Sequence, residues 1–369
     1  MTVKRIGTTL FTALLAFLVL AGCAVDRPPS GGPPDNAPLQ ITGTAPEPGS
    51  TGVVPESVRF TFNRYITAAA LRNALSVTPV GTGHEISADG QHAVITFTEP
   101  LAENTTHSIT LHSSLKSSRG NELENSYTYA FSTGPVLDTG RISGTVYTRN
   151  NRPASGITVA AVRENPRENG KLQVIDVKPE YNVQTGRNGS FEMNYIENGS
   201  YHLIVFRDRN GDRLINIHRE EYAAGRAETI PTGTSDLLFR LRQPESTASD
   251  QPVTAPAVEP SGAVTGSISG ARGTVVIEAL NTASNQWHRT AVPVANPSRP
   301  EPYLLEGLPP GTYRMSAYIA RNASAAPAIR PWDGGSIVPF RPADPLVIHP
   351  DDVRVRKGWT SGNIQFDFR

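Results

Sequence analysis

Oxygen-bearing side chains alternate along one short stretch of the sequence, residues 208–216. Asp208, Asn210 and Asp212 occupy every second position, and Asn216 follows. Calcium takes six to eight oxygen ligands, and alternating residues in a tight loop can direct several of them inward. This spacing predicts a calcium site made by Asp208, Asn210, Asp212 and Asn216, and calcium is the only cofactor that the chain suggests.

Two residues of this stretch do not fit a calcium loop. Arg213 stands where the turn of such a loop needs glycine, and Arg219 stands where a bidentate glutamate would close the site. Glu220 or Glu221 replaces that glutamate only if the loop is longer. The alternative is a polar hairpin loop that uses Asn210 and Gly211 to reach positive φ. Both interpretations stay open, and we favour the polar turn.

Tryptophan is concentrated in the last third of the chain. All three tryptophans, Trp287, Trp332 and Trp359, follow residue 262 in a chain with only 7% aromatic residues. Exposed indole rings on a β-sandwich can stack on sugar rings, so these residues are a candidate ligand platform. Packing within the core or between sheets is the alternative, and we favour it.

The sequence contains no pattern typical of a catalytic site. It has no Gly-x-Ser-x-Gly elbow, no phosphate-binding P-loop and no His-Glu-x-x-His. The eight histidines lack zinc-ligand spacing, and we expect them at solvated or edge positions. We therefore expect a protein that is not an enzyme. The histidines are His84, His92, His107, His112, His202, His218, His288 and His349.

Charge and cysteine content limit the partners and the means of stabilisation. The 34 Lys and Arg residues balance the 34 Asp and Glu residues, so no net field favours nucleic acid as a partner. The chain has a single cysteine, which rules out an intramolecular disulfide. Each folded module must then be held by its own apolar core, which modules of about 100 residues can build.

The N-terminal residues have the three parts of an export signal. Lys4 and Arg5 precede a mostly apolar run at residues 6–19, and Leu20-Ala21-Gly22-Cys23 follows. The run is shorter than the ~20 apolar residues that a membrane-spanning helix needs, but it suits the h-region of a signal peptide. Residues 1–22 are therefore expected to be a cleaved signal peptide.

Leu-Ala-Gly-Cys resembles the lipobox of bacterial lipoproteins. The resemblance implies that Cys23 receives a thioether diacylglycerol and that its new amino group takes an acyl chain such as palmitate. Two or three chains on one cysteine hold a soluble domain at a membrane for long periods, whereas one chain anchors it only marginally. Ala24 follows the cysteine in place of the aspartate that signals inner-membrane retention, which favours the outer membrane of the cell envelope.

Two segments rich in proline and small residues are expected to separate folded modules. Residues 23–39 lack apolar periodicity and are dense in Pro and Gly, which predicts an extended tether. Residues 243–261 are a Pro/Ser/Thr/Ala linker that cannot bury a core.

Residues 40–134 show the alternation of an all-β module. Val58, Phe60 and Phe62 alternate with polar residues, which predicts a strand with one buried face. Residues 68–75 are the one convincing helical stretch after the signal peptide. The module resembles bacterial Ig-like domains of the S-layer SbsA type, a family that implies a structural or spacer role. The motifs that carry the resemblance are Pro46-Glu47-Pro48-Gly49, Phe60-Thr61-Phe62, the stretch from Leu101 to Thr105, Gly120-Asn121 and Phe131-Ser132-Thr133.

Residues 139–242 and 262–369 look like two copies of one further module. Each begins with a Gly-x-Val strand, at Gly144 and Gly262, and each contains a Gly-x-Tyr strand, at Gly199 and Gly311. These features are similar to carboxypeptidase-regulatory-like domains, which have a transthyretin-like (prealbumin-like) sandwich.

The expected fold class is all-β: tandem β-sandwiches, Ig-like and then two transthyretin-like, after a cleaved lipoprotein signal peptide. The expected function is that of a structural or binding scaffold, anchored to the membrane by the lipid on Cys23. The alternative is a carbohydrate- or peptide-binding accessory lipoprotein of an envelope uptake or polysaccharide system. In either case the partners beyond the membrane are envelope proteins or glycans.

Overall fold

The computed structural model describes residues 35–163, 167–168, 171–172, 178–244, 261–321 and 329–368. Cys23, the expected signal peptide, most of the expected tether and most of the linker at 243–261 lie outside these ranges. Residues Pro38–Arg369 form one compact unit. Within the described ranges, no helix is both long and apolar enough to cross a membrane.

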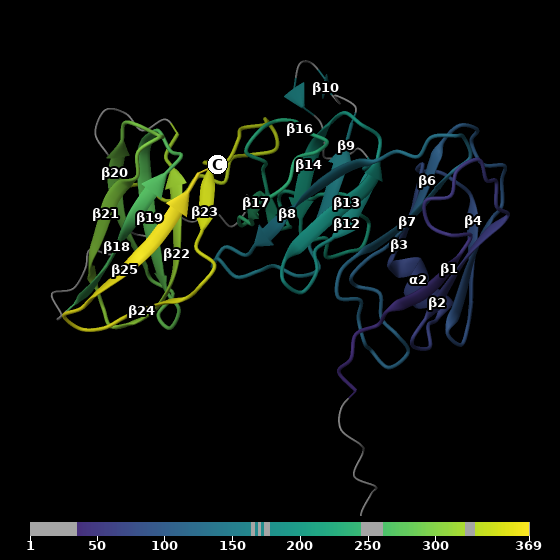
Figure 1. Ribbon diagram of the computed structural model, residues 1–369, viewed down its shortest axis with the longest axis horizontal. Helices are drawn as coiled ribbons and strands as arrows, with labels where there is room; N and C mark the ends of the chain where they lie inside the picture. The colour runs from purple at the N-terminus through teal and green to yellow at the C-terminus, as the bar shows by residue number, and fades with distance from the viewer. Residues whose placement is uncertain are drawn as a thin grey trace, which may run out of the picture. The chain divides into compact units, whose positions relative to one another are not determined.

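The first sandwich consists of two antiparallel sheets (Figure 1). One sheet has the order β1-β2-β5-β4, and its strands are β1 (Ile41–Ala45), β2 (Ser57–Phe62), β4 (His84–Asp89) and β5 (His92–Phe97). The other has the order β3-β6-β7, with β3 (Leu75–Thr78), β6 (Thr106–Leu111) and β7 (Tyr127–Ser132).

Strand alternation builds the core of this sandwich. Val58, Phe60 and Phe62 of β2 are all at most 1% exposed. Phe60 packs edge-on against Tyr129 of the facing sheet, with ring centroids 5.6 Å apart. Side chains at every second position share one face of a strand, so this pattern alone brings the two sheets together.

One short helix, α2 (Ala68–Asn73), precedes β3. The hydroxyl of Thr67 caps it by accepting the backbone N–H of Ala70 at 3.2 Å. The helix ends two residues before the expected boundary at residue 75, because Leu75 pairs with Leu111 at the start of β3. The pairing of β3 with β6 decides that boundary.

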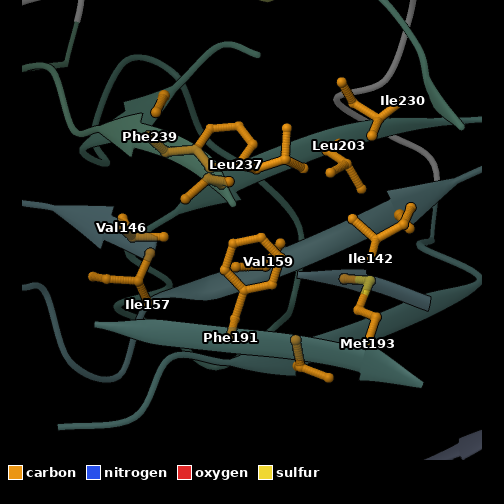
Figure 2. Packing of buried hydrophobic residues seen from close by; sticks show 14 of the residues in the cluster. Ile142, Val146, Ile157, Val159, Phe191, Met193, Leu203, Ile230, Leu237 and Phe239 are labelled. Atoms are coloured by element: carbon orange, nitrogen blue, oxygen red, sulfur yellow. The ribbon is translucent and has the colours of Figure 1, made fainter. Parts of the chain in front are cut away.

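The second sandwich again has two sheets. The first has the order β13-β8-β17, with β8 (Gly140–Tyr147), β13 (Ser190–Ile196) and β17 (Leu237–Arg240). The second is formed by β12 (Tyr181–Gln184), β9 (Thr158–Val162), β14 (Ser200–Phe206), β15 (Tyr222–Ala223) and β16 (Ile230–Pro231). A separate two-residue pair joins β10 (Arg167–Glu168) to β11 (Lys171–Leu172). Figure 2 shows the side chains of both sheets meeting in the core, Phe191 and Met193 among them.

The third sandwich has the same construction. One sheet has the order β21-β18-β25, with β18 (Gly262–Ser269), β21 (Glu301–Leu308) and β25 (Thr360–Asp367). The other contains β19 (Gly273–Asn281), β20 (Trp287–Val294), β22 (Gly311–Ile319), β23 (Leu346–Ile348) and β24 (Val353–Val355).

The last two sandwiches share one strand topology. In the second, β8 lies between antiparallel β13 and parallel β17. In the third, β18 lies between antiparallel β21 and parallel β25. The remaining sheets correspond as well, because β9 pairs with β12 and β14 as β19 pairs with β20 and β22. The expected fold class, all-β with tandem sandwiches, is confirmed. The transthyretin-like assignment and the module boundaries stay predictions.

A segment of the third module packs on the second sandwich. All five residues of β9 are buried, although alternation would leave one face of the strand open. Ile204 and Phe206 of the neighbouring β14 are also buried, and Ile337, with Val338 and Phe340 packed beside it, belongs to the same apolar cluster. The second sandwich therefore has both faces of one sheet covered, one by its own core and one by a cluster that combines Ile215 and Ile217 of the same module with Ile337.

Candidate functional site

The polar loop at residues 208–216 is held by hydrogen bonds to its own backbone. The two carboxylate oxygens of Asp208 accept the N–H groups of Gly211 at 2.7 Å and Arg213 at 3.0 Å. Asp212 accepts the N–H of Leu214 at 2.8 Å and the side-chain amide of Asn210 at 2.7 Å. These contacts are typical of Asx turns, in which short polar side chains replace missing backbone partners.

Asn216 belongs to a second turn in the same loop. Its side-chain oxygen accepts the N–H of His218 at 3.2 Å, and its own N–H donates to Glu220 at 2.9 Å. Glu220 also accepts the N–H of Arg209 at 3.0 Å and is only 3% exposed. The buried Glu220 carboxylate thus ties the two ends of the loop together, as a structural anchor.

The polar-turn interpretation accounts for these contacts of the loop. Within the described ranges, no group of three or more His, Cys, Asp or Glu side chains is arranged to hold a metal ion. Asparagine and carbonyl oxygens also bind calcium, so calcium at Asp208, Asn210, Asp212 and Asn216 stays a prediction.

Arg213 links this loop to the first sandwich. Its backbone has φ +61°, the left-handed conformation that glycine adopts most readily. Its guanidinium donates to the carbonyl of Leu75 in β3 at 2.7 Å. The residue that departs from the calcium-loop pattern therefore makes a contact between sandwiches.

A polar cavity of about 400 Å³ lies where the loop meets β3. Its volume is within the range of small-molecule sites, about 300–1,000 Å³, and its lining mixes apolar residues such as Leu75 and Val77 with charged and amide groups. Polar residues lining it include Arg72, Ser76, Lys178, Glu180, Asn182 and Arg213.

Ser76 and His112 form a close pair beside this cavity. The Ser76 hydroxyl lies 2.7 Å from His112 Nε2 and donates to the side-chain oxygen of Asn182 at 2.9 Å. With the Ser76 proton directed to Asn182, the Nε2–H of His112 donates to the hydroxyl. The trio is a contact between the first and second sandwiches.

The expectation that the histidines are solvated or at edges is wrong for His107, His112 and His202, which are 1%, 3% and 5% exposed. Burial lowers the pKa of His112 to about 3, and the nearby charge of Arg213 acts in the same direction. His112 is neutral at ordinary pH, which suits a buried hydrogen-bond donor.

The three tryptophans do not share one role. The Arg240 guanidinium lies 4.2 Å from the ring centre of Trp332 and 5.7 Å from that of Trp287. Trp332 also donates its indole N–H to the carbonyl of Asp344 at 3.1 Å. Trp359, by contrast, is 68% exposed. Trp287 and Trp332 pack on one arginine, and the platform of all three stays a prediction.

Arg240 and Glu278 form a buried ion pair that joins the second and third sandwiches. Arg240 of β17 is 4% exposed and lies 2.9 Å from Glu278 of β19, which is 1% exposed. Arg289 of β20 binds the other carboxylate oxygen at 2.9 Å. Burial raises the pKa of Glu278, but the two arginines outweigh it and hold that pKa below its usual range.

Polar neighbours complete this cluster. Ser316 donates to Glu278 at 3.1 Å, and Asn151 accepts from Arg240 at 3.1 Å while donating to Ser316 at 3.0 Å. Sequence reasoning missed the cluster, although a signal was present: Glu278 interrupts the apolar run of β19, Val275–Leu280. A charge inside a buried strand requires a partner.

Comparison with known families agrees with the geometry of the first sandwich. Residues 35–133 match the bacterial Ig-like domain family. The match covers the two sheets around Phe60 and Tyr129, so the Ig-like part of the expectation is confirmed for this module. A comparison with curated proteins finds no match.

Solved structures give weaker similarities. The N-terminal part of the bacterial S-layer protein SbsC is 16% identical over 54% of this chain and 42% of its own, with a TM-score of 0.20. The Bacillus anthracis TIE protein is 11% identical over 92% and 58%, with a TM-score of 0.17. An L,D-transpeptidase from Mycobacterium smegmatis is 12% identical over 57% and 91%, with a TM-score of 0.20. The chain thus spans less than two thirds of the first two proteins, and TM-scores this low carry no argument about its function.

Proposed function

We propose that this protein is a non-enzymatic lipoprotein of the bacterial envelope and acts as a scaffold of β-sandwiches with fixed spacing. The observation that carries the fixed spacing is the buried Arg240–Glu278 pair between the second and third sandwiches. The match of residues 35–133 to a bacterial Ig-like domain supports a structural role for the first module.

Buried contacts distinguish a scaffold of fixed spacing from a flexible string of modules. Removing one partner of a buried ion pair leaves an uncompensated charge and costs about 3–5 kcal/mol. Separating the last two sandwiches would expose Arg240 and Glu278 to water, and it would also uncover the apolar cluster around Ile337 and Phe206. The uncovered apolar surface opposes separation, and the buried pair fixes which faces meet, because either charge without the other would be buried unpaired.

Polar contacts join the first two sandwiches. The buried hydroxyl of Ser113 donates to the carbonyl of Thr185 at 2.9 Å, and Thr78 donates to the carbonyl of Glu180 at 3.2 Å. With the Arg213–Leu75 bond and the Ser76–Asn182 bond, they connect β3 and the end of β6 to the second sandwich. A series of modules connected in this way would hold its far end at a set distance from its anchor.

The anchor in this proposal is the lipid on Cys23, which lies outside the described residues. The basis is the order of Lys4 and Arg5, the apolar run and Leu20-Ala21-Gly22-Cys23. Two or three acyl chains would give stable attachment. Ala24 favours the outer membrane as the location.

Metabolic labelling tests the anchor. Cells expressing the chain are fed an alkyne analogue of palmitate, and the purified protein is probed for the label and its mass is measured. We expect the wild-type protein to carry the label and to begin at Cys23, and Cys23→Ser to lose the label and keep residues 1–22. A label that persists in Cys23→Ser, or a mature chain that begins elsewhere, would contradict the lipoprotein assignment.

A further inference from the structure

A tight turn connects β24 to β25 in the third sandwich and carries charged and aromatic side chains. The N–H of Trp359 donates to the carbonyl of Arg356 at 3.2 Å, which closes a four-residue turn. Lys357 and Gly358 are its central residues, and Gly358 has φ +69°. The turn places Arg356, Lys357 and Trp359 within four consecutive positions of one bend.

The side chains of this region face solvent. Val353 and Val355 of β24 are buried, so Arg354, between them, points away from the core, and Arg356 follows on the same side of the chain. Arg354, Arg356, Lys357 and Trp359 are all exposed. We call these four residues the basic–Trp turn.

The backbone of the turn is fixed. Gly358 donates to the carbonyl of Ser261 at 3.1 Å, and the N–H of Ala263 donates to the carbonyl of Trp359 at 3.0 Å. A Cβ on Gly262 would lie 2.4 Å from the carbonyl oxygen of Arg356, so the first residue of β18 packs directly against the turn. The exposed side chains are therefore presented by a rigid backbone.

Three cationic side chains of the turn have no counter-charge paired with them among the described residues. Among the described residues, Arg354, Arg356 and Lys357 make no ion pair, although the chain as a whole is neutral. The nearby Asp352 is paired with Arg314 at 3.4 Å. Asp351 lies beyond the opposite end of β24 from the turn.

We propose that the basic–Trp turn binds the surface of an anionic phospholipid membrane. Tryptophan prefers the membrane–water interface, where its apolar ring and its N–H both find suitable surroundings. Arginine and lysine are attracted to acidic headgroups, and each one near such a surface strengthens binding about fivefold. A soluble polyanion offers the same charge but no interface for the ring, so the exposed Trp359 favours the membrane.

The test uses residues Pro38–Arg369, a compact unit that contains all three cores and lacks Cys23. Binding is measured by co-sedimentation with vesicles of phosphatidylcholine and with vesicles of equal parts phosphatidylcholine and phosphatidylglycerol. We expect binding to the anionic vesicles only, weakening with salt, and a shift of tryptophan emission to shorter wavelength that is absent in Trp359→Ala. Because the fragment has no lipidation site, its result is independent of the lipoprotein assignment.

Two matched variants distinguish binding by this turn from a general effect of positive charge on the protein surface. Arg354→Gln with Arg356→Gln and Lys357→Gln should weaken vesicle binding about a hundredfold. The control removes three other exposed arginines, Arg59→Gln with Arg272→Gln and Arg299→Gln, and should bind like wild type. Equal loss in both variants, an emission shift that survives Trp359→Ala, or binding to soluble polyphosphate or a glycan without binding to vesicles would overturn the proposal.

Discussion

At the scale of single residues, buried polar side chains carry the contacts between modules. His112, with Ser76 and Asn182, connects the first sandwich to the second. Glu278, with Arg240, connects the second to the third. Such groups are costly to bury unless each finds a partner, so they act only when both modules are in place. Their protonation states therefore affect the free energy of unfolding of the whole chain.

His112 should make the protein less stable in mild acid. Its pKa is lowered from 6.5 to about 3 in the folded state, so below pH 6.5 the unfolded chain takes up a proton that the folded chain does not. The free energy of unfolding must then fall as the pH falls from 6.5 towards 3, by at most about 1.4 kcal/mol per pH unit from this group. His112→Gln keeps a side-chain N–H donor and removes the titration.

Urea unfolding at pH 7.5, 6.5 and 5.5 measures this effect. We expect the loss of stability between pH 6.5 and 5.5 to be smaller in His112→Gln than in wild type. His92→Gln, at an exposed position of β5, is the control and should keep the wild-type slope. Identical slopes in all three proteins would mean that His112 is not held neutral by the fold.

At the scale of elements, loops do more than connect strands. The 208–216 loop satisfies its own backbone through Asp208 and Asp212 and then reaches β3 through Arg213. The turn from β24 to β25 is fixed by Ser261 and Ala263 and leaves its side chains in solvent. Loops of both kinds can position side chains as firmly as strands do, because their backbone groups have defined partners.

Asp208→Ala separates the two interpretations of the 208–216 loop. If Asp208 only caps the backbone, its removal leaves two N–H groups without their partner and lowers the free energy of unfolding by about 1–3 kcal/mol, with or without calcium. We expect this result, and no change in the wild-type melting temperature between chelator and millimolar calcium.

A calcium site would behave differently. An ion that binds only the folded state adds about 2.7 kcal/mol at a hundredfold excess over its dissociation constant. A wild-type melting temperature that rises with calcium, and a rise that Asp208→Ala with Asp212→Ala abolishes, would establish the metal and contradict the polar turn. Thermal melts of residues Pro38–Arg369, with and without calcium, measure the melting temperature of the wild type and of the double variant.

At the scale of the whole molecule, the second and third sandwiches have separate cores but share a further apolar cluster. Ile337 packs on Ile204 and Phe206, which lie on the outer face of the sheet that contains β9 and β14. The other face of that sheet covers the core of the second sandwich. The ion pair of Arg240 and Glu278 adds a second buried connection. The two sandwiches should therefore stay together without the covalent link between them.

Cutting the expected linker at residues 243–261 tests this connection. With a specific protease site placed in that segment, the two pieces of the cut wild-type protein should elute together in gel filtration. Glu278→Gln with Ile337→Ala should release the third sandwich, because the first change leaves two arginines without their carboxylate and the second removes buried contacts worth about 2–5 kcal/mol. Glu192→Gln, which breaks an exposed ion pair with Arg141, is the control and should leave the pieces together. Separation of the wild-type pieces after cutting would contradict the fixed spacing.

The fold class could be predicted from the sequence because it depends on short-range patterns. Alternating residues such as Phe60 and Phe62 share a face of a strand, and Gly90 and Gly189 adopt the positive φ that their turns need. The repeat of the Gly-x-Tyr strands also indicated that residues 139–242 and 262–369 are related, and the two sandwiches share one topology. The lipidation of Cys23 rests on a local motif in the same way and stays a prediction.

The tertiary structure decided which polar and apolar residues meet across modules. Glu278 and Arg240 are 38 positions apart and lie in different sandwiches, and Ile337 packs on strands more than 100 positions earlier in the chain. No periodicity within a strand encodes such a contact, because Arg240 and Glu278 are ordinary outward-facing residues of their own sheets and Ile337 lies in a turn. Each becomes buried only when a second module covers it, and a local pattern carries no information about which module that will be.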